Sequence, residues 1–346
     1  MGFLSKLFSR KESAPSTQPN ISATVNANNG DILSDIPPLQ GDYAKTIFLW
    51  AHDKATAVRK NDEYARYFLY ECGITDPSAY HLELIHTGYF ECAPLDAILN
   101  SLKVADLKQF LSSIGQVTTG KKDALIERII QNADNSTIKA ICPDPLYVLS
   151  EMGRNFLSDH NDYVLVHKHK NWGIGWKEYD AHRRPGCSFY DTVWGIINKR
   201  IANDNQNFGR NEYLCMYQLL AEEGKRNRAI EMLLRVLYID LSGVCGMNCY
   251  KMYKDGFYTQ KELLEHFNVT VILAPGIINP ISEYKDVYSD DIVNHLYEQK
   301  LPVQICSKTL FLNIVHSILD GTYDEEIVEK HLKTAYTKMV KALQIA

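Results

Sequence analysis

Apolar residues recur three and four positions apart along most of the chain from about Tyr43 onward, which is the spacing of one helical face. Between Gly73 and Gly88, Asp76 and Pro77 supply an N-cap and a first-turn proline for one such helix. The alternating pattern of a strand is nearly absent apart from residues 269–273. The pattern predicts a mainly α, multi-helix protein with a helical C-terminal domain.

Changes in composition divide the chain into five predicted regions. Residues 12–42 are rich in Ser, Asn, Pro and Gly, so they bury too little apolar surface to offset the entropy of ordering. A short extended stretch that ends at Ser150 and leads into a helix is typical of winged-helix proteins and equally of helical domains that bind nothing. We expect a flexible N-terminal tail at 1–42, a helical N-terminal region at 43–97 and a two-helix module at 98–134. A helical linker domain, of winged-helix-like or plain topology, should follow at 135–205, and a helical C-terminal domain at 206–346.

The two-helix module has the clearest pattern. Its first helix is predicted at 102–114, where Gly115 supplies a C-terminal stop, and its second at 121–131, with Thr118 or Thr119 as the N-cap. Gly120 is expected in an exposed turn between them. The two helices should pack through Val104, Leu107 and Leu111 of the first and Leu125, Ile126 and Ile129 of the second. Ile114 and Ile130 lie at the ends of these two faces.

Charge changes the picture only locally. The formal net charge of the chain is -5, which argues against a protein that coats nucleic acid through bulk positive charge. Residues 101–130 nevertheless contain five Lys or Arg residues and three acids. Because free N–H groups at a helix N-terminus attract phosphate, Lys121 and Lys122 at the start of the second helix indicate a phosphate site.

The module resembles the SAP domain, whose two helices flank an extended loop; related LEM-like and HeH folds share this geometry. The residues that carry the resemblance are Leu102, Leu107, Lys108, Leu111, Gly115, Val117, Gly120, Lys121, Lys122, Leu125, Ile126 and Arg128. The resemblance implies DNA binding with a preference for AT-rich duplex. The flank at 61–92 is similar to sequence beside SAP modules in bacterial and phage proteins. The predicted nucleic-acid-binding residues are Lys103, Lys108, Thr119, Gly120, Lys121, Lys122 and Arg128.

A second basic cluster lies further along the chain, interleaved with tryptophans. Cations between aromatic rings can follow a nucleic-acid backbone and stack on bases. The alternative is a solvated basic face beside core tryptophans. The candidate residues of this secondary patch are His167, Lys168, His169, Lys170, Arg183 and Arg184.

Two other functions remain open. A metal-dependent nuclease would use His167 and His169 with Asp180 or His182, but no acidic cluster at metal-binding spacing accompanies them. The common nucleotide-binding and hydrolase motifs are absent, so we predict no catalytic residues. A protein-interaction scaffold would use the helices of 206–346 to bind another protein, leaving the two-helix module purely structural. The sequence does not identify a small-molecule ligand.

The cysteines and the apolar runs complete the expectations. The eight cysteines include no CxxC pair, and the chain has no secretory signal, so we expect reduced thiols and a cytoplasmic protein. Cys245 and Cys249 have no second pair to complete a tetrahedral set, so neither a metal nor a cofactor is predicted. No run of about 18 apolar residues occurs, so no membrane span is predicted.

Overall fold

The computed structural model describes residues 36–133, 144–203, 208–242, 275–301 and 304–342, with Gly256, Thr259 and Glu262. Three expectations fall on other residues. Most of the predicted tail, the strand at 269–273 and the Cys245–Cys249 pair lie outside the described residues.

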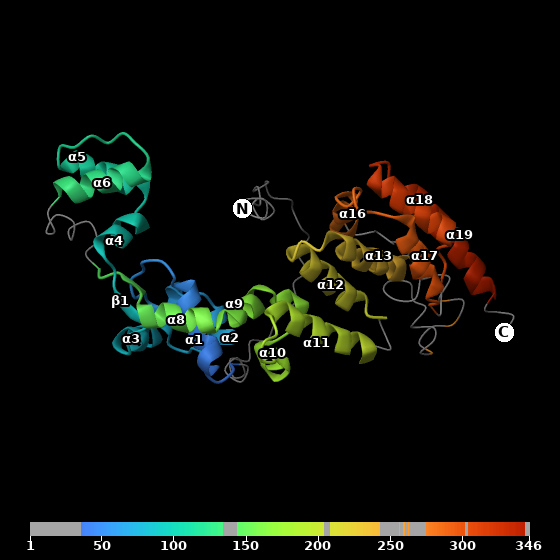
Figure 1. Cartoon of the computed structure of the whole chain (residues 1–346), viewed down its shortest axis with the longest axis horizontal. Helices are drawn as coiled ribbons and strands as arrows, with labels where there is room; N and C mark the ends of the chain where they lie inside the picture. The colour runs from blue at the N-terminus through green and yellow to red at the C-terminus, as the bar shows by residue number, and fades with distance from the viewer. Residues whose placement is uncertain are drawn as a thin grey trace, which may run out of the picture. The chain divides into compact units, whose positions relative to one another are not determined.

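The described chain is mainly helical, as predicted (Figure 1). Its two strands are short and form one sheet, β1 (Phe90–Cys92) and β2 (Tyr147–Leu149). The helices before β2 are α1 (Gly41–Ala51), η3 (Asn61–Glu63), α2 (Tyr67–Tyr70), α3 (Pro77–His86), α4 (Leu95–Ser101), α5 (Val104–Ser113) and α6 (Lys122–Asn132). Those that follow are α8 (Glu151–Asp159), α9 (Asn161–Lys168), η4 (Lys170–Trp172), α10 (Trp176–His182), α11 (Phe189–Asn203), α12 (Arg210–Glu222), α13 (Arg226–Ser242), α16 (Pro275–Ser282), α17 (Asp290–Glu298), α18 (Lys308–Leu319) and α19 (Glu325–Ala342).

The chain divides into two compact units. Unit 1 comprises residues 1–44 and 55–147, and unit 2 comprises 45–54 and 148–346. Helix α1 therefore begins in unit 1 and continues in unit 2. The five regions predicted from composition are a finer division than these two units, and their boundaries stay a prediction.

Local sequence signals set the start of α3 and the turn before it in unit 1. The Asp76 carboxylate accepts a hydrogen bond of 2.9 Å from the Ala79 N–H, and Pro77 occupies the first turn, as predicted. Gly73 adopts a φ of 72°, and a Cβ there would lie 2.4 Å from the Pro38 carbonyl oxygen. Only glycine fits this turn, because both its backbone angle and its space exclude a side chain.

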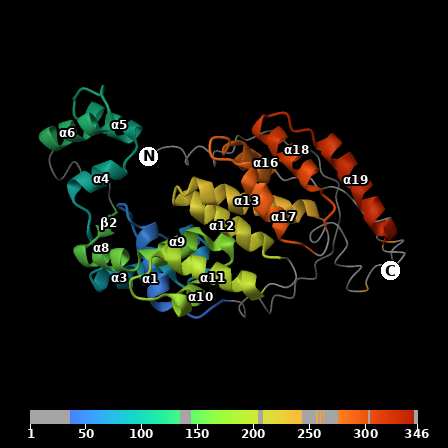
Figure 2. The same ribbon diagram turned by 45° about the vertical axis from the view of Figure 1, so that its right-hand side comes forward.

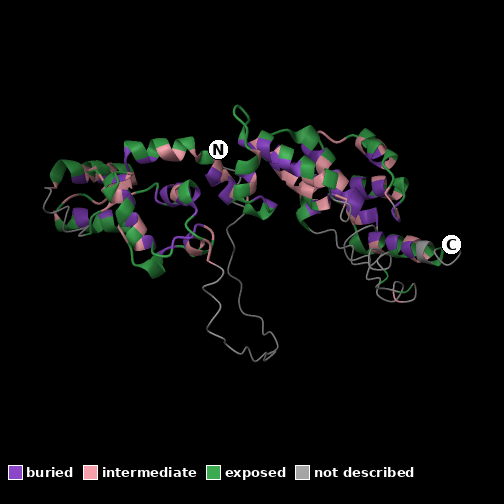
Figure 3. Ribbon diagram, turned by 90° about the horizontal axis from the view of Figure 1, so that it is seen from below, coloured by how far each residue is buried: buried purple, intermediate pink, exposed green. Residues whose placement is uncertain are grey.

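The largest apolar core lies in unit 2 and centres on α13 (Figure 2). Helices α12 and α13 pack against each other as a hairpin joined at Gly224, and α16, α17 and α18 also contact this group. A bidentate ion pair ties the hairpin together, since the Arg210 guanidinium donates to both Asp240 carboxylate oxygens at 2.6 and 2.7 Å. Buried residues gather on the packed faces of the helices and exposed residues on the others (Figure 3).

No helix among the described residues has the combined length and apolar character that a bilayer span needs.

Candidate nucleic-acid interface

Helices α5 and α6 form the predicted hairpin, with α4 packed against α6 (Figure 1). Leu107, Leu111, Leu125, Ile126 and Ile129 are buried as expected. Leu99 of α4 and Phe110 of α5 complete this separate small core. The hairpin thus depends on α4 for closure, as two short helices alone bury little surface.

Two predicted core positions were wrong. Val104 is 41% exposed and Ile130 is 47% exposed. Val104 is the first residue of α5, one turn before the buried Leu107, so it lies at the end of the packed face. Phe110, which the pattern did not predict as a core residue, is buried in this core.

The end of α5 follows the Schellman pattern. Gly115 has a φ of 71°, the Gln116 N–H donates to the Leu111 carbonyl at 2.8 Å, and the Gly115 N–H donates to the Ser112 carbonyl at 3.1 Å. These bonds satisfy carbonyls that the helix itself leaves open. The predicted stop at Gly115 is confirmed.

The start of α6 differs from the prediction. Its N-cap is Lys121 rather than Thr118 or Thr119, and no side chain caps the first-turn N–H groups. By contrast, the Asp106 carboxylate at the start of α5 accepts a hydrogen bond of 3.2 Å from the Lys103 N–H. The start of α6 therefore keeps donors that a bound anion could satisfy.

Arg128 and Lys122 make hydrogen bonds within the module. Arg128 Nη1 donates to the Val117 carbonyl at 2.5 Å and to the Thr119 carbonyl at 3.1 Å. Lys122 Nζ donates to the Asn100 carbonyl at 2.6 Å. Both side chains are half-buried. Two of the five predicted cations thus hold the loop and the end of α4 in place.

The other predicted residues lie in solvent. Lys103, Lys108 and Lys121 are exposed, and their side chains have no ion pair or hydrogen bond within the part of the chain that the structure describes. Thr119 and Gly120 are exposed next to Lys121 in the loop before α6. The exposed turn predicted at Gly120 is confirmed.

The secondary patch is divided between the core and the surface of unit 2. His167 is buried, and its ring meets that of Trp50 edge to face, with centroids 5.4 Å apart. His169 stacks on Trp172 with centroids 4.1 Å apart, and its Nε2 lies 3.3 Å from a Glu222 oxygen.

The cations of the secondary patch are exposed but partly engaged. Lys168 lies over the Trp50 ring at 5.3 Å, and Arg183 lies 3.8 Å from Asp180. Lys170 and Arg184 are exposed. The two histidines are packing residues in this structure, and their neighbours Trp50 and Glu222 are too distant in sequence for the pattern to reveal.

Within the described ranges no group of three His, Cys, Asp or Glu side chains is arranged to hold a metal ion. His167, His169, Asp180 and His182 therefore do not converge as a ligand set.

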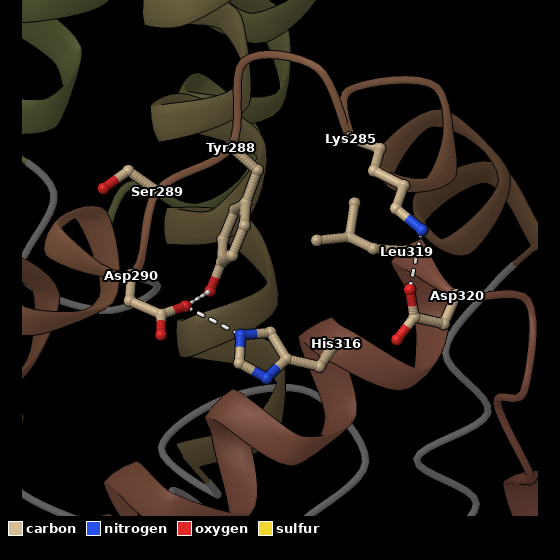
Figure 4. Close-up of a pocket in the computed structure, with 7 residues that line it drawn as sticks. All are labelled: Lys285, Tyr288, Ser289, Asp290, His316, Leu319 and Asp320. Atoms are coloured by element: carbon tan, nitrogen blue, oxygen red, sulfur yellow. Dashed lines mark hydrogen bonds and ion pairs between the residues drawn. The ribbon is translucent and has the colours of Figure 1, made fainter.

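A pocket of about 380 Å³ lies in unit 2 between the start of α17 and the end of α18 (Figure 4). Its polar groups bind one another: Asp290 Oδ1 lies 2.7 Å from His316 Nε2 and accepts from the Tyr288 hydroxyl at 2.8 Å. These hydrogen bonds, first that from His316, lower the pKa of Asp290. Lys285 pairs with Asp320 at 2.8 Å. The arrangement joins the N-terminal end of α17, which carries the positive end of its dipole, to the C-terminal end of α18, which carries the negative end. The spacing of these residues in the sequence did not indicate it.

The comparisons with known proteins agree with the hairpin geometry. The family model of the SAP domain matches residues 98–133, which confirms the resemblance in that segment. No curated protein matches the chain. No solved structure matches it either.

Proposed function

We propose that the chain is a non-enzymatic nucleic-acid-binding protein whose SAP domain contacts duplex DNA phosphates. The SAP match supports nucleic-acid binding in general. The choice of duplex DNA follows what the SAP resemblance implies, and the phosphate contact rests on the residues at the start of α6.

The observation that carries the proposal is the pairing of uncapped helix donors with a free cation. The first turn of α6 has no side-chain cap, and Lys121 at the N-cap position is exposed. Backbone N–H groups at a helix start bind a phosphate oxygen, and an adjacent ammonium adds charge-assisted attraction. Lys103 and Lys108 on α5 add two exposed positive charges within the same domain.

The charge of the whole chain makes this interface local. With a net charge of -5, the remainder of the protein does not attract DNA by its total charge. Binding through a few lysines must then weaken as salt rises. Each phosphate contact contributes about −0.9 to the slope of log K against log salt concentration.

The test is fluorescence anisotropy of the full chain with labelled duplex DNA, single-stranded DNA and RNA at several salt concentrations. We expect duplex binding that weakens as salt rises. The Lys121→Ala variant should weaken it on every duplex sequence, because phosphate contacts carry no base information. Its slope should fall by about one unit.

Lys300→Ala is the matched control, because Lys300 is an exposed lysine of unit 2 outside the SAP domain. It should bind DNA as the wild type does. Equal loss in both variants, or no binding to any of the three nucleic acids, would contradict the proposal. The latter result would favour the protein-interaction scaffold.

A further inference from the structure

We infer that Arg128 is a positioning residue, which fixes the loop between α5 and α6 so that Lys121 is presented to phosphate. This inference rests on the proposed function. It gives Arg128 a role other than the direct phosphate contact expected from its charge.

The geometry places Arg128 behind the loop. From the middle of α6, its Nη1 reaches two loop carbonyls, those of Val117 and Thr119, at 2.5 and 3.1 Å. The two carbonyls belong to residues on either side of Thr118. One side-chain nitrogen therefore holds the middle of the loop against α6.

Apolar packing does not hold this part of the loop. Val117 is 59% exposed, and Thr119, Gly120 and Lys121 are also exposed. The Gln116 N–H bond to Leu111 fixes only the beginning of the loop. Beyond it, among the described residues, the hydrogen bonds from Arg128 are the side-chain contacts that hold the loop backbone.

Loop position matters because Lys121 is both the last loop residue and the N-cap of α6. The Lys121 carbonyl is fixed to α6, because it accepts from the Leu125 N–H at 3.1 Å. A displaced loop therefore changes the backbone on the other side of Lys121, and with it the direction in which the ammonium leaves the helix start. A lysine at position 128 would keep the charge but replace the planar, pre-organised guanidinium with a shorter, freely rotating donor.

The experiment is a double-mutant cycle on duplex DNA with Arg128→Lys and Lys121→Ala in the full chain. We expect Arg128→Lys alone to raise Kd about fivefold although the charge is unchanged, and to change Kd less than about twofold in the Lys121→Ala background. Such non-additivity indicates that the first residue acts through the second. Wild-type affinity in Arg128→Lys, or effects that multiply in the double variant, would overturn the inference.

Backbone NMR order parameters supply a readout that is independent of DNA. Arg128→Gln should lower them at residues 117–120, whose carbonyls at Val117 and Thr119 lose their partner, while those of α5 and α6 stay unchanged. Lys108→Gln removes the same charge from an exposed site without a loop contact, and it should leave the loop order parameters unchanged. Unchanged loop order parameters in Arg128→Gln would overturn the positioning role. Lower order parameters in a chain that binds no DNA would instead count against the proposed function alone.

Discussion

Two basic segments of this chain have similar composition and different environments. Around Lys121 the exposed lysines have no acidic partner among the described residues, and the nearby helix start has no side-chain cap. In the 167–184 segment, His169 pairs with Glu222 and stacks on Trp172, while Arg183 pairs with Asp180. The lysines of the first segment lack acidic partners within the described ranges, whereas the second segment has exposed cations beside a histidine and an arginine that contact carboxylates.

The difference comes from what each segment packs against. The SAP hairpin is closed by aliphatic side chains and one phenylalanine, so its cations remain outside a small apolar core. The 167–184 segment joins the large core of unit 2 through Trp172 and Tyr179, which brings His169 near Glu222 on α12. A run of cations and aromatics therefore indicates a binding surface only where the core does not take up its aromatic rings.

The largest expected effect is on the stability of unit 2. Trp172→Ala should destabilise it by about 3 to 5 kcal/mol, because the ring is buried and its Nε1–H donates to Gln218 at 2.6 Å. Hydrogen exchange at α9, α11 and α12 measures this loss. Lys170→Ala, an exposed neighbour, should stay within about 0.5 kcal/mol. A small effect of Trp172→Ala would show that the aromatic segment is a surface and remove the contrast.

The SAP domain should respond in the same way at its own core. Leu111→Ala removes a fully buried side chain and should destabilise the hairpin by about 2 to 5 kcal/mol, with DNA binding lost through unfolding. Hydrogen exchange at α5 and α6, with unit 2 as an internal reference, measures the effect. Val104→Ala is the matched control, and its exposure predicts a change within about 0.5 kcal/mol. Equal effects at the two positions would mean that the core is wrongly assigned.

The sequence predicted helices and their local signals well, because both depend on near neighbours. Gly115, Asp76 and the inner face of α6, except Ile130, follow from spacing and backbone preference alone. The Lys121 N-cap was missed because capping preference favours Thr118 or Thr119. An N-cap carbonyl accepts the first hydrogen bond of its helix, whereas the Thr119 carbonyl accepts from the Arg128 side chain instead. That hydrogen bond spans nine residues, a longer separation than a capping rule considers.

The chemical roles of the charged side chains were the least predictable part of the site. Arg128 and Lys121 look equivalent in a basic motif, yet one is half-buried against carbonyls and the other is in solvent. The acceptors that distinguish them are the Val117 and Thr119 carbonyls of the loop, whose placement only the folded module defines. The same holds for His169, whose partner Glu222 lies on another helix.

Matched charge removal tests the contrast directly. Replacing Lys103, Lys108 and Lys121 with alanine should lower the slope of log K against log salt by about two to three units. Replacing Lys168, Lys170 and Arg184 with alanine removes the same charge from three exposed sites of the other segment and should change affinity less than about threefold. Anisotropy with duplex DNA measures both. If the second set weakened binding as much as the first, the 167–184 segment would belong to the interface.

The smallest expected effect has the opposite sign. Asp123 lies in the first turn of α6, where its carboxylate would repel a bound phosphate while favouring the positive end of the helix dipole. Asp123→Asn should therefore tighten duplex binding about twofold, corresponding to roughly 0.4 kcal/mol, and lower the stability of the hairpin by a similar amount. Glu127→Gln makes the same charge change one turn further along α6 and should tighten binding less. The gain should shrink as salt rises, because exposed charges are screened. Equal gains in the two variants would show that DNA responds to the overall charge of the domain rather than to a phosphate held at the start of α6.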